Sequence, residues 1–205
     1  MQKRWYSNDD GYRTWLNPAE QSMLLDVYRG EELNRLFALM LGLHGLRSEE
    51  ILHVRPADFR ALDGEREGHK LYVRKGKRHR QRECPVSREV VQLASYSGVN
   101  ADESVVQVTT KTLRDWIQTA REQLRASTGD DDWQYVGMHD LRRTWATTTF
   151  YTLAFDGNPI AEELTMGWGG WKMTDSGRQT FRENYLGPEP DFIAGAAMET
   201  LSLPE

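Results

Sequence analysis

Hydrophobic positions along the chain recur mostly every three or four residues, the interval that places side chains on one face of an α-helix. The densest such segment, residues 33–43, is apolar around most of its circumference, which predicts a central, buried helix. A long amphipathic helix is expected to begin at Thr110 or Thr112, and its apolar face carries Leu113, Trp116, Ile117, Ala120 and Leu124. The chain is therefore predicted to be mainly helical.

Capping residues mark where several of these helices begin. Asn17-Pro-Ala-Glu20 has the form of a capping box and predicts a helix that stops at Gly30. Ser48 is expected to cap a short helix over residues 49–54, and Ser87 a further one that ends before Gly98. A last short helix is predicted over residues 180–185, and an amphipathic one over the tail, residues 191–201.

Two stretches depart from the helical spacing. Residues 71–73 and 83–86 flank a basic segment that contains Gly76, which predicts two antiparallel strands and a connecting turn. The loop over residues 167–171, Gly-Trp-Gly-Gly-Trp, is expected to be broken by its glycines, and the first dozen residues are expected to be irregular. The predicted fold class is α+β, mainly helical, with a small antiparallel hairpin or sheet at one edge.

Composition narrows the class of protein. The length of 205 residues suits one ordinary domain, and 28% of the residues are charged. The sequence contains neither an apolar signal core nor a run long enough to span a bilayer, so we expect a cytoplasmic protein without membrane contact. The single cysteine, Cys84, excludes an internal disulfide and is interpreted as a buried filler.

The net charge of -5 argues at first against a nucleic-acid partner, but DNA binds a local basic stripe rather than a net charge. Such a stripe coincides with the predicted hairpin and consists of Arg66, Lys70, Arg74, Lys75, Lys77, Arg78, Arg80 and Arg82. A solvated surface and a DNA-binding surface are both compatible with this run.

Residues 138–149, Met-His-Asp-Leu-Arg-Arg-Thr-Trp-Ala-Thr-Thr-Thr, begin another predicted helix and place His139 beside Arg142 and Arg143. A guanidinium group binds phosphate oxygens bidentately, and an imidazole titrates near neutral pH. This combination suits chemistry on a phosphodiester. Taken alone, the pattern is more often that of ordinary surface or capping residues on a helix.

Three further segments contain the other groups that such chemistry needs. Gly45-Leu-Arg47-Ser-Glu-Glu50 places an arginine at a tight helix junction, Lys75 precedes Gly76 in the hairpin, and Tyr185 precedes Leu-Gly in the last short helix. With His139-x-x-Arg142 between them, this ordered set resembles the catalytic domain of the tyrosine recombinases, or phage integrases. The resemblance extends from about Asn17 to Leu186.

The resemblance implies a role for each residue in cutting and rejoining DNA through a 3′-phosphotyrosine. Tyr185 would be the nucleophile, Arg47 and Arg142 would hold the phosphate oxygens, and Lys75 would protonate the leaving 5′-oxygen. His139 would serve acid–base transfer, Trp171 would donate a hydrogen bond to the phosphate, and Glu50 would support Arg47. No cofactor or metal is expected, because the arginines supply the positive charge.

Several assignments keep an alternative. Lys77 lies on the same side of the strand as Lys75, and Arg143 is as close to His139 as Arg142 is. Trp171 stands fourteen residues before Tyr185, farther than is usual in the family, and Trp168 competes with it. Tyr151 and Tyr135 compete less well with Tyr185.

The resemblance further implies partners and domain organisation. Residues 1–16 are interpreted as an arm or linker remnant and residues 17–205 as the catalytic domain, without the N-terminal core-binding domain usual in the family. Double-stranded DNA is the expected partner, contacted by Arg74, Lys77, Arg78, Arg80 and Arg143. A monomer or dimer free in solution would assemble into a homotetramer on DNA, associated with the nucleoid, and the tail helix would dock on a neighbouring protomer or pack on its own domain.

Three other functions remain open from the sequence. A type IB topoisomerase would share the chemistry but needs room for a clamp around DNA. A regulator derived from an integrase would bind DNA without cutting it. A helical domain with no nucleic-acid role would make the arginines dispensable for DNA binding.

Overall fold

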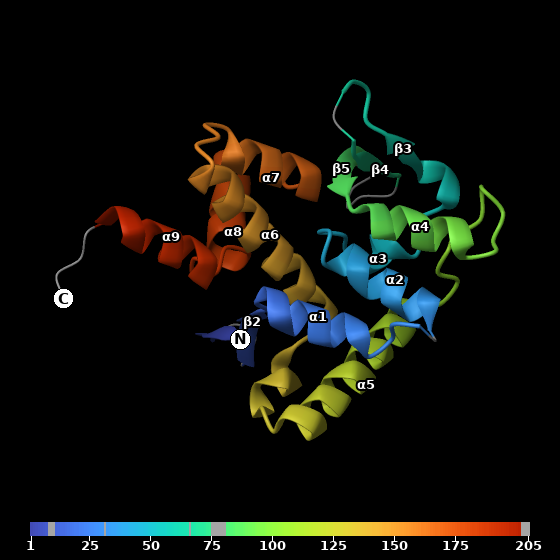
Figure 1. Ribbon diagram of the computed structural model, residues 1–205, viewed down its shortest axis with the longest axis horizontal. Coiled ribbons are helices and arrows are strands. Elements are labelled where there is room, and N and C mark those ends of the chain that lie inside the picture. The colour runs from blue at the N-terminus through green and yellow to red at the C-terminus, as the bar shows by residue number, and fades with distance from the viewer. Residues whose placement is uncertain (8–10, 31, 66, 75–80, 202–205) are drawn as a thin grey trace.

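The computed structural model describes residues 1–7, 11–30, 32–65, 67–74 and 81–201. The long helix α6 (Met138–Phe155) runs through the middle of the molecule, and the other elements surround it (Figure 1). The remaining α-helices are α1 (Pro18–Asp26), α2 (Leu33–Gly42), α3 (Ser48–Ile51), α4 (Arg88–Tyr96), α5 (Thr110–Thr128), α7 (Ala161–Gly169), α8 (Asp175–Asn184) and α9 (Asp191–Leu201). Short 3-10 turns occur at Pro56–Asp58 and Asp131–Tyr135. The predicted mainly helical α+β class is confirmed.

The predicted hairpin is confirmed and belongs to a three-stranded antiparallel sheet. Its strands are β3 (Phe59–Ala61), β4 (His69–Val73) and β5 (Arg82–Val86), with β4 in the middle. Leu71 lies opposite Cys84, and both side chains are fully buried against the helices. Cys84 is therefore core, as predicted. The turn that carries Lys75, Lys77, Arg78 and Arg80 lies outside the described residues.

The expectation of an irregular N-terminus is wrong. Strands β1 (Gln2–Tyr6) and β2 (Gly11–Trp15) form an antiparallel hairpin that packs on α6. Apolar periodicity could not reveal it, because two of the three buried residues in β2 are Arg13 and Thr14. Their hydrogen-bond partners lie far along the sequence: Arg13 Nη1 donates to Asn184 Oδ1 at 3.1 Å, and the Asp140 carboxylate accepts the Thr14 amide N–H at 3.2 Å.

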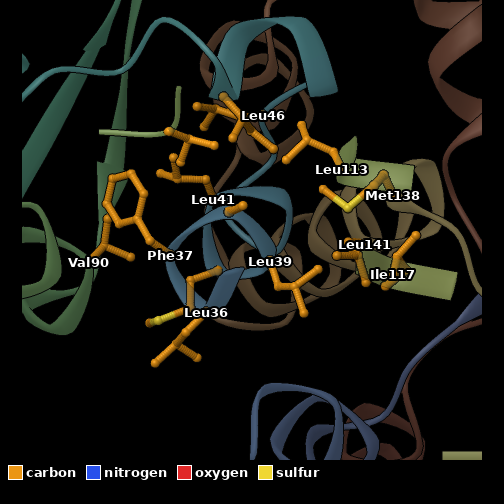
Figure 2. Packing of buried hydrophobic residues seen from close by; sticks show 14 of the residues in the cluster. Leu36, Phe37, Leu39, Leu41, Leu46, Val90, Leu113, Ile117, Met138 and Leu141 are labelled. Carbon is orange, nitrogen blue, oxygen red and sulfur yellow. The ribbon is translucent and has the colours of Figure 1, made fainter. Parts of the chain in front are cut away.

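The main hydrophobic core lies between α2, α5, α6 and the sheet. Its residues include Leu39, Leu41, Leu113 and Leu141, all with no exposed surface, and Figure 2 shows their side chains packed around α2. This burial follows from the apolar surface of residues 33–43, since a helix that is apolar on most sides is stable only when covered.

A second, smaller cluster lies on the other end of α6 and joins it to α7 and α8. It consists of Ala146, Met166, Trp171 and Phe181, with Tyr185 packed against it. The two clusters meet along α6, and this boundary is where the candidate catalytic residues come together.

Helix boundaries agree with the capping signals at some points and differ at others. The capping box at Asn17 and the Ser87 cap are both present. Arg47, rather than Ser48, is the N-cap of α3, because the Glu50 carboxylate reaches back to the Arg47 amide N–H.

Two boundaries near the C-terminus also differ from the prediction. Gly167 and Gly169 are helical, so the predicted broken loop is instead the end of α7, which stops at Gly170 in a left-handed conformation (φ +73°). α8 begins at Asp175, five residues earlier than expected, with Thr174 as its cap. The predicted tail helix is confirmed as α9. Within the described part of the chain, no helix is both long and apolar enough to cross a membrane.

Candidate active site

Arg47 stands at the tight junction between α2 and α3. The chain turns there through Gly45 at φ +84°, where a β-carbon would run into the Trp145 ring. Arg47 donates from Nη1 to Glu50 Oε1 at 2.8 Å and from its backbone N–H to Glu50 Oε2 at 2.8 Å. The guanidinium group is held at a fixed place and remains partly exposed, at 20% of its side-chain surface.

Glu50 is buried and accepts hydrogen bonds from a second arginine. Arg82, the first residue of β5, donates from Nη1 and Nη2 to the two carboxylate oxygens at 2.8 and 2.7 Å. Burial alone would raise the pKa of the Glu50 carboxyl, but the bonds and charges of Arg82 and Arg47 outweigh it and lower the pKa below its usual value. Glu50 is therefore ionised and shared between two guanidinium groups.

Arg142 connects the two hydrophobic clusters. It has no exposed surface, and it donates from Nη1 to the Gly45 carbonyl and from Nη2 to the Gly169 carbonyl, the latter at 2.6 Å. Its Nε–H is buried and has no hydrogen-bond acceptor among the described residues. Burial, followed by repulsion from Arg47, lowers the pKa of Arg142 to about 9, so the group is still charged at neutral pH.

Trp171 packs directly on this arginine, with its ring centre 4.1 Å from the Arg142 guanidinium carbon. Its indole N–H is likewise buried without an acceptor in the described part of the chain. Gly169 makes the approach possible, since a β-carbon there would overlap the Trp171 ring. Trp168 lies differently: it packs against the main core, and its carbonyl accepts a bond from Arg82. Geometry thus places Trp171, and not Trp168, beside Tyr185.

Tyr185 directly follows α8, and its ring lies among these groups. The ring centre is 4.6 Å from that of Trp171, 5.2 Å from that of His139 and 5.6 Å from the Arg142 guanidinium carbon. Its backbone carbonyl accepts bonds from Trp15 Nε1 at 3.1 Å and from Thr147 Oγ1 at 3.0 Å. The tyrosine is therefore anchored from the N-terminal hairpin and from α6 at once.

His139 occupies the first turn of α6, on the Tyr185 side. The residue reaches the surface, but desolvation of the imidazole by the surrounding protein, followed by repulsion from Arg143 and Arg142, lowers its pKa to about 3. At neutral pH the ring is consequently uncharged and has a lone pair to accept a proton.

Arg143 points away from this cluster, although it is the next residue after Arg142. It donates from Nη1 to Asp140 Oδ1 at 2.6 Å and from Nε to the Asn184 carbonyl at 3.2 Å. Arg74, a predicted DNA contact, forms an ion pair with the buried carboxylate of Asp58. Both arginines are thus engaged in bonds that hold the fold.

The structure brings together Arg47, Glu50, His139, Arg142, Trp171 and Tyr185 of the predicted set. Lys75, Lys77, Arg78 and Arg80 lie outside the described residues, so their predicted roles stay predictions. The sequence interpretation missed Arg82 and Trp15 as site neighbours. Arg82 was visible only as part of a basic run, and nothing in the sequence tied Trp15 to a tyrosine 170 residues away.

Chemically, the cluster offers a phenol close to the Arg142 guanidinium group, to an uncharged imidazole and to an indole N–H that has no acceptor among the described residues. In the described ranges, His, Cys, Asp and Glu side chains form no group of three or more that could hold a metal ion. The guanidinium group of Arg142, 5.6 Å from the Tyr185 ring centre, places positive charge near the tyrosine, which suits an anionic substrate.

The fold is that of the tyrosine recombinase catalytic domain, which confirms the resemblance at the level of the fold. The chain superposes on XerA recombinase with a TM-score of 0.60 at 18% identity, covering 94% of this chain and 66% of that one. The Tn1549 transposon integrase, in complex with transposon right end DNA, gives a TM-score of 0.59 at 18% identity, covering 97% and 69%.

A lambda integrase dimer bound to a core site is also similar, with a TM-score of 0.58 at 16% identity over 84% of this chain and 48% of that one. The chain spans about two thirds of the length of the first two structures. No protein-family model matches the sequence, and no curated protein does either.

Proposed function

We propose that this protein is a site-specific DNA recombinase or integrase that breaks and rejoins strands through a 3′-phosphotyrosine on Tyr185. The observation that carries the proposal is the convergence on one tyrosine ring of His139 and Arg142 from α6 and of Trp171 from the segment after α7. The fold is shared with integrases whose structures contain DNA, which supports duplex DNA as the partner.

Two unpaired donors beside the tyrosine support a phosphate as the ligand. Arg142 Nε–H and Trp171 Nε1–H are both buried without acceptors among the described residues. A buried donor that makes no hydrogen bond costs about 1–3 kcal/mol of folding free energy. A non-bridging phosphate oxygen accepts such bonds. Because Arg142 is fully buried and packed against the Trp171 and Tyr185 rings, the tyrosine ring has to shift for the phosphate to reach it.

In the proposed reaction the Tyr185 oxygen attacks phosphorus while the bond to the 5′-oxygen breaks, so the phosphodiester becomes a phosphotyrosine and a free 5′-hydroxyl. The phenolic proton passes to His139, and Lys75 donates a proton to the leaving oxygen. Arg47 and Arg142 offset the negative charge that develops on the equatorial oxygens. Attack by the 5′-hydroxyl reverses these steps and rejoins the strand.

In this scheme the binding of DNA changes the pKa of His139, the proton acceptor. Burial, followed by repulsion from neighbouring arginines, holds the pKa of His139 near 3. A phosphodiester between those arginines offsets their charge, which raises the pKa of His139 and makes the imidazole a better proton acceptor. The proposed site therefore becomes basic at the tyrosine only when DNA is bound.

A covalent-trapping experiment tests the function. Nicked duplexes with a randomised core are incubated with the protein, and adducts that survive denaturation are recovered and sequenced. Wild type and the matched control Tyr151→Phe are expected to form an adduct at enriched sequences, whereas Tyr185→Phe forms none. An adduct that persists in Tyr185→Phe would overturn the assignment of the nucleophile.

The second function that a specific observation favours is an inactive DNA-binding regulator. Both Nη groups of Arg142 are already occupied by protein carbonyls, an arrangement that also suits a purely structural arginine. DNA binding by wild type without any adduct in the trapping experiment is the outcome that supports this function.

Assembly on DNA is proposed from the tail. Phe192, Met198 and Leu201 on α9 are 46%, 57% and 62% exposed, and Figure 1 shows this helix at the edge of the molecule. We propose that α9 docks on a neighbouring protomer in a DNA-bound tetramer. Sizing the complexes with and without residues 190–205 checks this, and identical assemblies would contradict it.

A further inference from the structure

Arg82 stands out as a buried charge with an unusually complete set of bonds. Its side chain is 6% exposed, and it donates to both oxygens of Glu50 and from Nε to the Trp168 carbonyl at 2.6 Å. These bonds engage Nε, Nη1 and Nη2 of the guanidinium group with acceptors inside the fold. Arg82 thus links β5, α3 and the end of α7, from which Trp171 follows.

Charge counting shows why such a residue matters at a phosphate site. Glu50 touches Arg47 as well as Arg82, with an Nη1 to Oε1 distance of 2.8 Å in both cases. With Arg47 as its only partner, a buried carboxylate would cancel the positive charge of that arginine. Arg82 supplies the second positive charge, so the pair of arginines around Glu50 keeps a net charge of one.

We propose that Arg82 is a positioning residue that neutralises the Glu50 carboxylate and thereby keeps the positive charge of Arg47 available to a DNA phosphate. Arg82 does not touch the phosphate in this scheme; it acts through Glu50. The bidentate geometry also fixes Glu50, whose oxygens hold the Arg47 backbone and side chain in place.

The mutual influence of the arginines supports this inference. After burial, repulsion from Arg47 is the largest cause that lowers the pKa of Arg142, ahead of the opposing effect of Glu50. Among the groups that lower the pKa of Glu50, Arg82 acts more strongly than Arg47.

Affinity for a nonspecific 30-base-pair duplex tests the proposal, which rests on the proposed DNA function. Arg82→Gln is expected to weaken binding about tenfold at low salt and to make affinity less dependent on salt. The reason is that Glu50 would then cancel the charge of Arg47, so the contact between Arg47 and a phosphate is lost. The double variant Arg82→Gln/Glu50→Gln removes the carboxylate too and is expected to return to within about threefold of wild type. A double variant as weak as the single one overturns the proposal.

The chain offers a matched control pair on the same sheet. Arg60 and Glu83 form an exposed bidentate pair at 2.7 Å, so Arg60→Gln changes the net charge by the same amount as Arg82→Gln. Arg60→Gln is expected to change affinity less than about twofold, since the pair is solvated. An equal loss in both variants would mean that only total charge matters, and the proposal would fail.

Folding is checked by the thermal midpoint of each variant. If Arg82→Gln does not fold, Arg82→Lys takes its place, because it keeps the charge but loses the bidentate geometry. Neutralisation of Glu50 then predicts affinity within about threefold of wild type, and a loss as large as that of Arg47→Gln contradicts it.

A readout without DNA separates this inference from the proposed function. Phenylglyoxal modifies accessible arginines, and labelling of Arg47 is followed by mass spectrometry. In Arg82→Gln the Glu50 carboxylate is left to Arg47 alone, so labelling is expected to slow at least threefold; in the double variant it is expected to exceed wild type. Unchanged labelling would refute the role of Arg82 even if the protein cuts DNA, and the expected pattern would support that role even if wild type binds no DNA.

Discussion

The two faces of α6 use adjacent arginines for opposite purposes. Arg142 faces the smaller aromatic cluster and the candidate site, where no carboxylate contacts its guanidinium group directly and its Nε–H has no acceptor among the described residues. Arg143 faces the N-terminal hairpin, where Asp140 and the Asn184 carbonyl satisfy it. Successive residues on a helix point about 100° apart, so this division follows from helix geometry.

The difference separates the proposed phosphate-binding arginine from one with a structural role, although both side chains are buried. The structural arginine has a carboxylate that pairs with its charge. The other has only carbonyls and aromatic faces as direct partners, and burial, followed by repulsion from Arg47, lowers its pKa to about 9. An uncompensated buried charge is costly to the fold, and the proposed phosphate is the group that would compensate it.

The substitution Arg142→Gln is expected to have the largest effect and tests the role of the arginine that faces the candidate site. Loss of the cation is expected to lower the rate of covalent adduct formation by about 100- to 1000-fold, as for other groups that stabilise developing negative charge. The free energy of unfolding is expected to change by less than about 2 kcal/mol, because relief of a buried charge offsets the lost carbonyl bonds. Single-turnover trapping and urea denaturation measure the two effects. A large loss of stability with little loss of rate would make Arg142 structural.

Arg143→Gln should show the opposite pattern. Removing this partner leaves the buried Asp140 carboxylate with only backbone N–H groups, and breaking a buried pair costs about 3 kcal/mol. Adduct formation per folded molecule is expected to fall less than about fivefold. The measurement is again urea denaturation, with Arg142→Gln as the matched control, and equal stability of the two variants would erase the distinction between the faces.

Trp15→Phe tests whether the hairpin face reaches the tyrosine. The substitution keeps an aromatic ring but removes the indole N–H that Tyr185's carbonyl accepts, a bond worth about 1 kcal/mol. Adduct formation is expected to fall about fivefold, while affinity for DNA stays the same. Trp5→Phe, on the exposed side of the hairpin, serves as the control. An unchanged rate would show that the hairpin does not position Tyr185.

The smallest expected effect concerns the pH dependence of stability. The folded protein holds the pKa of His139 near 3, below its unfolded value. Between these two pKa values the unfolded chain binds a proton on His139 and the folded chain does not. Stability attributable to this group is therefore complete above about pH 6.5 and is lost as the pH falls toward 3. Arg143→Gln removes the largest charge that opposes protonation and should raise the pKa of His139, measured by NMR titration. A pKa that stays in place would show that the two faces are electrically separate.

The predictions from sequence agree best with the structure where they depend on interactions between residues close together in the chain. The capping box at Asn17, the Ser87 cap and the buried helix over residues 33–43 were predictable, because backbone capping and apolar spacing depend on near neighbours. The ordered set around His139 was found through a family resemblance, since no local rule links Arg47 to Tyr185.

What the sequence could not indicate depends on long-range polar contacts. Spacing alone left Arg142 and Arg143 equivalent, and their difference appears only when Gly169 and Asp140 are placed around them. Trp171 and Trp168 are separated in the same way, by the helical turn that ends at Gly170. In the sequence Arg82 is one charge of a basic run, and only the structure shows that its side chain is bonded to Glu50.

The bond from Trp15 to the Tyr185 carbonyl joins parts of the chain that lie 170 residues apart. Such contacts form late, because the entropy of closing a long loop is lost before the contact contributes any stability. The tyrosine is thus held in place only once both ends of this span have met. Incompletely folded molecules of this protein would accordingly lack a positioned Tyr185, so that the proposed capacity to cut DNA would arise together with the last step of folding.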